Sequence, residues 1–162
     1  MPATTTSSHQ SLVMLNHLAR VARRTSEAAL EPSGLRPRHV VALTILRDRG
    51  SMTQVALGEV LHLDPTNLVG LLNELERKEL LERRRDVLDR RRHIVELSDA
   101  GRTTLAGAER ALAAVQDQVL AGLDDDERST LHALLARATG PISCDTAAEA
   151  TVACAADEAE PC

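Results

Sequence analysis

Residues 61–101 read LHLDPTNLVGLLNELERKELLERRRDVLDRRRHIVELSDAG. Asp64 is a favourable helix N-cap, and Pro65 would take the first helical position, where its missing N–H is not needed. Leucines then recur three and four residues apart, which indicates one buried stripe of an α-helix. They are Leu68, Leu71, Leu72 and Leu75. The pattern predicts an amphipathic helix that starts at Pro65.

The face opposite the leucines carries short polar residues. At about 100° per residue, it holds Thr66, Gly70, Asn73 and Arg77. Short hydrogen-bonding side chains suit base edges in a DNA major groove better than they suit simple solvation. A helix with a leucine stripe is more often an ordinary core helix, so this face alone does not establish DNA binding.

An arginine-rich segment follows at once. It contains Arg83, Arg84, Arg85, Arg90, Arg91 and Arg92 against only Asp86 and Asp89. A basic run is usually a solvated surface, but here it directly follows the helix and favours a basic β-hairpin. Upstream, Thr53 can cap a short helix with four residues to bury, namely Val55, Leu57, Val60 and Leu61. Two helices joined by a tight turn and followed by a basic hairpin predict a winged helix-turn-helix that holds duplex DNA.

The rest of the chain has the patterns of further helices. Residues 12–30 form one, Pro32 to Gly34 break it, and Pro37 opens another that ends at Gly50. After the hairpin, Val95 and Leu97 share a strand face and Ser98 caps a long helix. Its seam residues, spaced three and four apart, are Leu105, Ala108, Leu112, Val115 and Val119. A capping box of Asp124 and Glu127 starts a last helix. Its expected buried stripe is Leu131, Leu134, Leu135 and Ala138.

We therefore expect a mainly α fold with a small β-hairpin wing, made of a winged helix-turn-helix domain and a helical dimerisation domain. Residues 1–34 would join the dimerisation region and 35–97 would form the DNA-binding domain. Residues 98–140 would supply the C-terminal dimerisation helices, and the acidic segment 141–162 would be a disordered tail. The alternative is that the terminal helices pack only on their own DNA-binding lobe.

Composition narrows the class of protein. The 162 residues include no Phe, Tyr or Trp, which argues against a binder of single-stranded nucleic acid, because such proteins stack bases on aromatic rings. The formal net charge is −5. Removing the five acidic residues after Gly140 leaves equal numbers of acidic and basic residues. The wing can therefore still attract DNA, because the local field decides groove attraction.

Other classes of protein are disfavoured. No apolar run approaches the roughly 20 residues that span a bilayer, and no signal-peptide pattern opens the chain, so a cytoplasmic location is expected. Asp126, Ser129 and His132 share one helix without an oxyanion-donating loop, so no catalytic role is expected. The six histidines show no metal-site spacing, and we expect neither a metal site nor a cofactor. The three cysteines, all in the tail, do not resemble a disulfide framework; they are Cys144, Cys154 and Cys162.

Several of these motifs together resemble the MarR family of bacterial winged-helix regulators. They are Leu35-x-Pro37, Thr53-Gln54, Leu61-x-Leu63-Asp64, Leu75-Glu76, Leu80-Leu81-x-Arg83 and DRRRHIVELSDAG at 89–101. The resemblance covers roughly residues 12–140, and the 89–101 segment is its most specific part. Two departures stand out. Glu79 occupies a position where the family commonly has a helix-ending Gly, and the aromatic residues common around the family's ligand pocket are missing.

The resemblance implies a homodimeric transcriptional regulator, usually a repressor released by a small-molecule effector. A two-fold dimer would bind double-stranded DNA at an inverted-repeat operator. The expected DNA-binding residues are Pro65, Thr66, Asn67, Gly70, Asn73, Arg77, Arg84, Asp89, Arg90 and Arg91. An effector pocket would involve Asn16, His17, Arg20 and His39.

Within this set, Thr66, Asn67, Gly70 and Asn73 would discriminate bases. Asp89 would orient a neighbouring guanidinium while Arg90 or Arg91 enters the minor groove. The remaining wing arginines, Arg83, Arg84, Arg85 and Arg92, would contact phosphates or neutralise the hairpin. Two alternatives stay open: a thiol-redox or metal-responsive regulator that uses the tail cysteines, and a winged-helix protein-interaction module without DNA binding. The effector, the operator sequence and the direction of regulation are not encoded in any recognisable motif.

Overall fold

A computed structural model describes residues 5–139, and this part of the chain forms six α-helices, one short 3₁₀ helix and three strands. In chain order they are α1 (Thr5–Leu30), η1 (Glu31–Ser33), α2 (Pro37–Arg49), β1 (Met52–Thr53), α3 (Gln54–Leu61), α4 (Pro65–Arg77), β2 (Leu81–Arg85), β3 (His93–Leu97), α5 (Asp99–Val119) and α6 (Asp125–Thr139). The predicted fold class, mainly α with a small β wing, is confirmed. Residues Cys144, Cys154 and Cys162, on which the redox alternative depends, lie outside the described residues.

The helix-turn-helix forms where the capping residues predicted it. Thr53 Oγ1 accepts a hydrogen bond from the Ala56 N–H at 3.1 Å and so caps α3. Asp64 Oδ1 accepts from the N–H groups of Thr66 and Asn67 at 3.0 and 3.1 Å and caps α4. All four leucines of the α4 stripe are buried. The sequence-based prediction for α4 is therefore confirmed from its cap to its buried face.

The prediction for Val55 is wrong, because its side chain is 68% exposed. Leu57 and Leu61 are buried as expected, and Val60 is partly buried. Val55 lies two positions before Leu57, about 200° around the helix, so the two side chains point to opposite sides. The side of α3 that carries Leu57 and Leu61 faces the core, so Val55 faces solvent.

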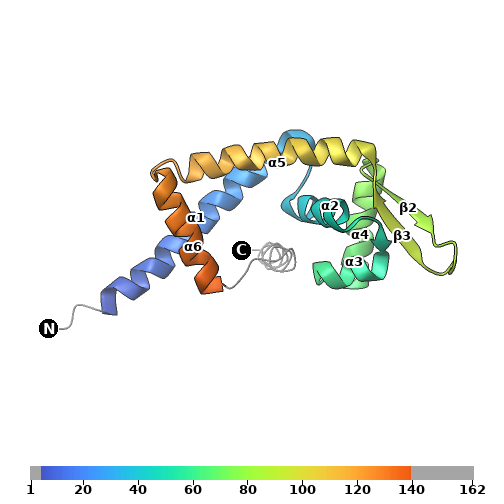
Figure 1. Cartoon of the computed structure of the whole chain (residues 1–162), viewed down its shortest axis with the longest axis horizontal. Helices are drawn as coiled ribbons and strands as arrows, with labels where there is room; N and C mark the ends of the chain where they lie inside the picture. The colour runs from blue at the N-terminus through green and yellow to red at the C-terminus, as the bar shows by residue number, and fades with distance from the viewer. Residues whose placement is uncertain (1–4, 140–162) are drawn as a thin grey trace, which may run out of the picture.

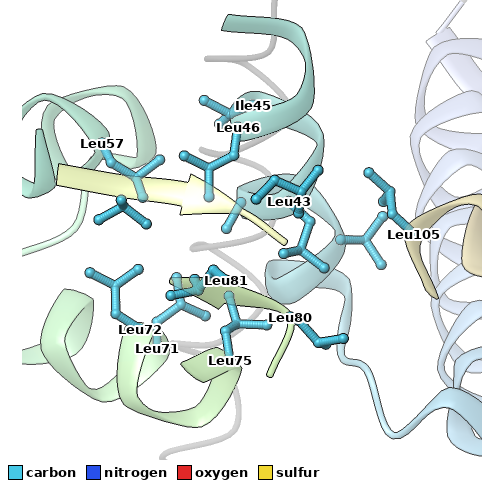
Figure 2. Packing of buried hydrophobic residues seen from close by; sticks show 14 of the residues in the cluster. Leu43, Ile45, Leu46, Leu57, Leu71, Leu72, Leu75, Leu80, Leu81 and Leu105 are labelled. Carbon is cyan, nitrogen blue, oxygen red and sulfur yellow. The ribbon is translucent and has the colours of Figure 1, made fainter. Parts of the chain in front are cut away.

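The three strands form one antiparallel sheet in the order β1-β3-β2. Arg83 on β2 pairs with Val95 on the central strand, and Leu81 pairs with Leu97. Val95 and Leu97 are both buried, which confirms their predicted common face. Figure 2 shows apolar side chains from α2, α4, β2 and α5 converging on one core. Among them are Leu43, Leu46, Leu72, Leu75, Leu81 and Leu105.

Helix α4 ends in a left-handed residue that is not glycine. Glu79 has a φ of 59°. Its N–H donates to the Glu76 carbonyl at 2.8 Å, and the Leu80 N–H donates to the Leu75 carbonyl at 3.0 Å. These two bonds make a Schellman motif, in which glycine normally occupies the left-handed position. The departure from the family pattern at this position therefore places a strained residue between α4 and the wing.

We expect Glu79→Gly to raise the stability of the protein by about 1 kcal/mol, because glycine adopts a positive φ without a Cβ clash. Thermal unfolding should shift upward by roughly 2–4 °C. Glu79→Ala is the matched control, since it removes the same side-chain atoms beyond Cβ but keeps the strain. An equal gain in both variants would mean that the Glu79 side chain, and not its backbone, is the cause.

The terminal helices lie at the far end of α5 from the wing (Figure 1). Helix α1 begins at Thr5, earlier than predicted, and packs against α5. The predicted capping box of α6 is present: the Asp124 N–H donates to Glu127 Oε2 at 3.0 Å, and the Glu127 N–H donates to Asp124 Oδ1 at 2.9 Å. The predicted burial of the α6 stripe is wrong for a single chain. No described residue of α6 is buried, and Leu134 is 53% exposed.

The described helices include none that is both long enough and apolar enough to cross a membrane.

Candidate nucleic-acid interface

The outer face of α4 is open to solvent along its length. Thr66, Asn67, Asn73 and Arg77 are exposed, as is Pro65 at the start of the helix. A Cβ placed on Gly70 would meet no atom within 4 Å. This face is therefore free to approach a partner surface closely, and it is closest at Gly70, where no side chain projects.

The N-terminus of α4 is held by its cap. Two hydrogen bonds from Asn67 lower the pKa of the Asp64 carboxyl below its usual range. The bond from the backbone N–H has the larger effect, followed by the bond from the side-chain amide. The carboxylate is therefore ionised at neutral pH. Because Asn67 Nδ2 donates to Asp64, the side chain of Asn67 is positioned by the cap itself.

Arg83 connects the base of the wing to the outer face of α4. We expected it to contact phosphates or neutralise the hairpin. Instead its Nη2 donates to Asn73 Oδ1 at 2.6 Å, and its Nε donates to Glu76 Oε2 at 3.0 Å. The guanidinium is the main reason that the pKa of Glu76 lies below its usual range. The sequence did not predict this pairing of Arg83 with Glu76, because it bridges a helix and a strand.

The tip of the wing is an ordered turn built on two aspartates. Asp86 Oδ1 accepts from the Leu88 N–H at 2.9 Å, and Asp89 Oδ1 accepts from the Arg91 N–H at 3.0 Å. Asp89 Oδ2 also lies 3.5 Å from Arg92 Nε, and both side chains are exposed. The role of Asp89 in orienting a guanidinium toward DNA stays a prediction. Arg90 and Arg91 are exposed at this tip. The wing arginines thus differ in their surroundings, since Arg84 lies 3.6 Å from Glu96 on the adjacent strand.

A buried histidine supports α4 from its inner side. His39 of α2 is 1% exposed. Its Nδ1 accepts a hydrogen bond from the Arg36 N–H at 3.1 Å, so its Nε2 carries the proton and donates to Glu74 Oε2 at 2.9 Å. Arg38 also donates to both oxygens of Glu74, at 3.1 and 3.2 Å. Burial alone would raise the pKa of Glu74, but the bonds from His39 and Arg38 hold it below its usual range.

This arrangement predicts a pH-dependent stability. Burial lowers the pKa of His39 below its ordinary value of 6.5 and outweighs the opposing pull of Glu74. Between the lowered pKa of His39 in the folded protein and its ordinary pKa in the unfolded chain, the unfolded chain binds more protons than the folded one. The stability held above pH 6.5 should therefore fall as the pH drops through the folded-state pKa, with a slope of at most about 1.4 kcal/mol per pH unit.

Chemical denaturation between pH 8 and 5.5 measures this slope. His39→Gln should flatten it. His132→Gln, at an exposed position on α6, is the matched control. Equal slopes for the parent and His39→Gln would show that His39 does not couple stability to pH.

The proposed effector-pocket residues lie in different surroundings. Asn16, His17 and Arg20 are exposed on α1, whereas both ring nitrogens of buried His39 have partners within the chain. Two surface hollows are lined by residues of α3 and its neighbours, including Gln54, Val55 and Glu59. The effector pocket therefore stays a prediction. Residues 5–139 also contain no group of three or more His, Cys, Asp or Glu side chains that could hold a metal ion.

The helix-turn-helix, the open face of α4 and the basic wing define the chain as a winged-helix protein of the DNA-binding class. The family model of the MarR family matches residues 35–93. A putative transcriptional regulatory protein for the hcr operon of Thauera aromatica is 30% identical over 115 residues, which cover 71% of this chain and 69% of that protein. The chain belongs to the MarR family of transcriptional regulators.

Solved structures agree with this fold. The YusO protein of Bacillus subtilis is 20% identical with a TM-score of 0.71, over 85% of this chain and 96% of that one. A cysteine-to-serine mutant of MarR from E. coli, solved in complex with operator DNA, is 21% identical with a TM-score of 0.67, over 85% of this chain and 99% of that one. At these identities the likeness concerns the fold alone.

Proposed function

We propose that this regulator is a homodimeric repressor that binds an inverted-repeat operator in double-stranded DNA and is released by a small-molecule effector. The observation that supports operator binding most strongly is the connection, through Arg83, between the exposed face of α4 and the basic wing. This connection gives a duplex-binding surface with a fixed internal geometry. Repression and effector release are supported by family membership.

The proposed contacts divide between two grooves. Thr66, Asn67, Gly70 and Asn73 face the base edges of the major groove from the exposed side of α4. Pro65, Arg77 and Arg84 flank this face and contact the DNA backbone. Asp89 orders the wing tip, so that Arg90 and Arg91 enter the minor groove. Arginine suits this place because its planar head loses its hydration more easily than an ammonium group does.

The exposed apolar surface of the terminal helices supports the dimer. Leu12, Val13 and Met14 of α1 are each about two-thirds exposed. Helix α6 carries a leucine stripe of which no described residue is buried. A second copy of the chain that covers these surfaces would bury them and place two α4 helices about a two-fold axis, as an inverted repeat requires. The proposed dimerisation regions are residues 1–34 and 98–140, and the proposed DNA-binding domain is 35–97.

The salt dependence of DNA binding tests the wing. A duplex selected from a random pool by the purified protein would serve as the operator. Arg90→Ala and Arg91→Ala should each weaken binding, and each lost phosphate neutralisation should reduce the slope of log K against log salt by roughly 0.9. A dimer carries the substitution twice, so the reduction can reach about two units. The melting temperature should not change, because the wing tip contributes no core residue.

Arg110→Ala is the control, because it removes the same charge from an exposed position on α5. Unchanged affinity and slope in both wing variants, with the fold intact, would show that the wing does not hold DNA. A parent protein that selects no duplex at all would instead favour the protein-interaction alternative.

A further inference from the structure

The side-chain amide of Asn73 is held in one orientation by Arg83. Arg83 Nη2 lies 2.6 Å from Asn73 Oδ1. A guanidinium has donors and no acceptor, so the Asn73 atom that faces it must be the oxygen. The Nδ2 group of Asn73 therefore points away from Arg83, on the exposed face of α4.

The guanidinium is itself fixed by two further constraints. Its Nε donates to Glu76 Oε2 at 3.0 Å, and Nη2 also contacts that oxygen. Asn73 and Glu76 are three residues apart and so lie on the same side of α4, where one guanidinium can reach both. The backbone of Arg83 belongs to β2 and pairs with Val95 of the central strand. With its side chain only 20% exposed, Arg83 is a rigid part of the protein rather than a mobile surface charge.

The orientation of the amide decides what Asn73 can bind. An asparagine that is free to rotate makes its best base contact with adenine, accepting from N6 and donating to N7. Here one of the two lone pairs of the oxygen is already bonded to a cation, and the charge of that cation disfavours a second donor at the oxygen, whether N6 of adenine or N4 of cytosine. The same positive charge favours the O6 acceptor of guanine and the O4 acceptor of thymine.

We propose that Arg83 is a positioning residue that makes Asn73 a hydrogen-bond donor toward DNA, so that Asn73 selects guanine or thymine rather than adenine in each half-site. This inference rests on the proposed binding of duplex DNA by α4. It assigns to Arg83 a role in base specificity that differs from the phosphate contact expected of a wing arginine.

The first experiment uses the parent protein. The operator sequence selected by the parent is compared with the sequence selected by the Asn73→Ala variant. The base pair at which the parent has a preference and the variant has none marks the position that Asn73 contacts. The parent is then measured on four duplexes that differ only at that base pair. We expect guanine or thymine to bind about tenfold tighter than adenine, the size of one base-specific contact. Tightest binding to adenine, or no preference that depends on Asn73, would overturn the proposal.

The second experiment changes Arg83. Arg83→Met removes all its donors but keeps an unbranched side chain, and should move the preference at this base pair toward adenine by about tenfold. Arg83→Lys keeps a charged donor and should restore much of the parent preference. The matched control is Arg84→Met, on the same strand but paired with Glu96, which should weaken binding to all four duplexes alike.

The outcomes distinguish a failure of this inference from a failure of the proposed DNA binding on which it rests. A parent protein that binds no duplex would refute DNA binding itself. A parent that binds DNA, with the same base preference in Arg83→Met as in Arg84→Met, would refute only the role of Arg83. Thermal melting of each variant shows whether a change in base preference accompanies a change in fold.

Discussion

Gly70→Leu is expected to weaken operator binding strongly while leaving the protein at least as stable as its parent. The Cβ position of Gly70 faces open space, with no atom within 4 Å, so a side chain added there starts without a clash. Leucine also forms helices more readily than glycine, by most of 1 kcal/mol. In the complex, the same side chain would occupy the space between α4 and the base edges. Overpacking costs roughly 1–3 kcal/mol per site. Because a dimer carries the substitution twice, the cost is roughly 2–6 kcal/mol, so affinity should fall by at least about 30-fold at 1.4 kcal/mol per tenfold.

Gly70→Ala separates the two effects. It should stabilise α4 by roughly 0.5–1 kcal/mol, and its loss of affinity should lie between those of the parent and Gly70→Leu. Thermal melting and operator titration of the three proteins make the measurement. A Gly70→Leu protein that binds the selected operator like the parent would show that α4 does not approach DNA at this position.

Features governed by a few neighbouring residues could be predicted from the sequence. Asp64, Thr53 and Ser98 each cap the helix that follows, because a cap needs only a side-chain oxygen within three residues of the N–H groups it satisfies. The spacing of the leucines in α4 was enough to predict which face of that helix is buried. The exposure of Thr66 and Asn73 follows from that stripe, so the outer face of the candidate site was predictable as well.

Burial that depends on a distant partner could not be predicted from these patterns. Val55 and Leu57 are both apolar, and only the packing of α3 against the rest of the lobe decides which of them is buried. The leucines of α6 have the spacing of a buried stripe, but nothing in one described chain buries them fully. Periodicity identifies an apolar face without identifying what covers it.

The contacts that hold the residues of the candidate site together also could not be predicted from the sequence. His39 meets Glu74 across 35 positions, and Arg83 meets Asn73 across 10. Each pair joins α4 to another element, α2 in the first case and β2 in the second. The arginines of the wing look alike in sequence, and only the register of β2 on β3 distinguishes Arg83 from Arg84.

Gly101→Ala is expected to destabilise the protein by about 3 kcal/mol or more, at the upper end of what overpacking costs. A Cβ on Gly101 would lie 2.0 Å from the carbonyl oxygen of Leu80 and 2.7 Å from Leu97 Cδ1. The backbone at Leu80 cannot easily move away. Its N–H donates to the Leu75 carbonyl at the end of α4, and its carbonyl accepts from the Ser98 N–H at the start of α5. The added methyl group would therefore force apart the point where α4, the wing and α5 meet.

Gly107→Ala is the matched control for this substitution, because it lies in the same helix and its Cβ would meet no atom within 4 Å. It should stabilise α5 by up to about 1 kcal/mol through helix propensity. Thermal unfolding should therefore shift in opposite directions for the two variants, down by at least roughly 6 °C for Gly101→Ala. Operator affinity should also fall in Gly101→Ala, since the displaced backbone carries the wing away from α4. A Gly101→Ala protein as stable as Gly107→Ala would mean that α5 can shift along Leu80 without cost, and that the contact at Gly101 does not hold the wing in place.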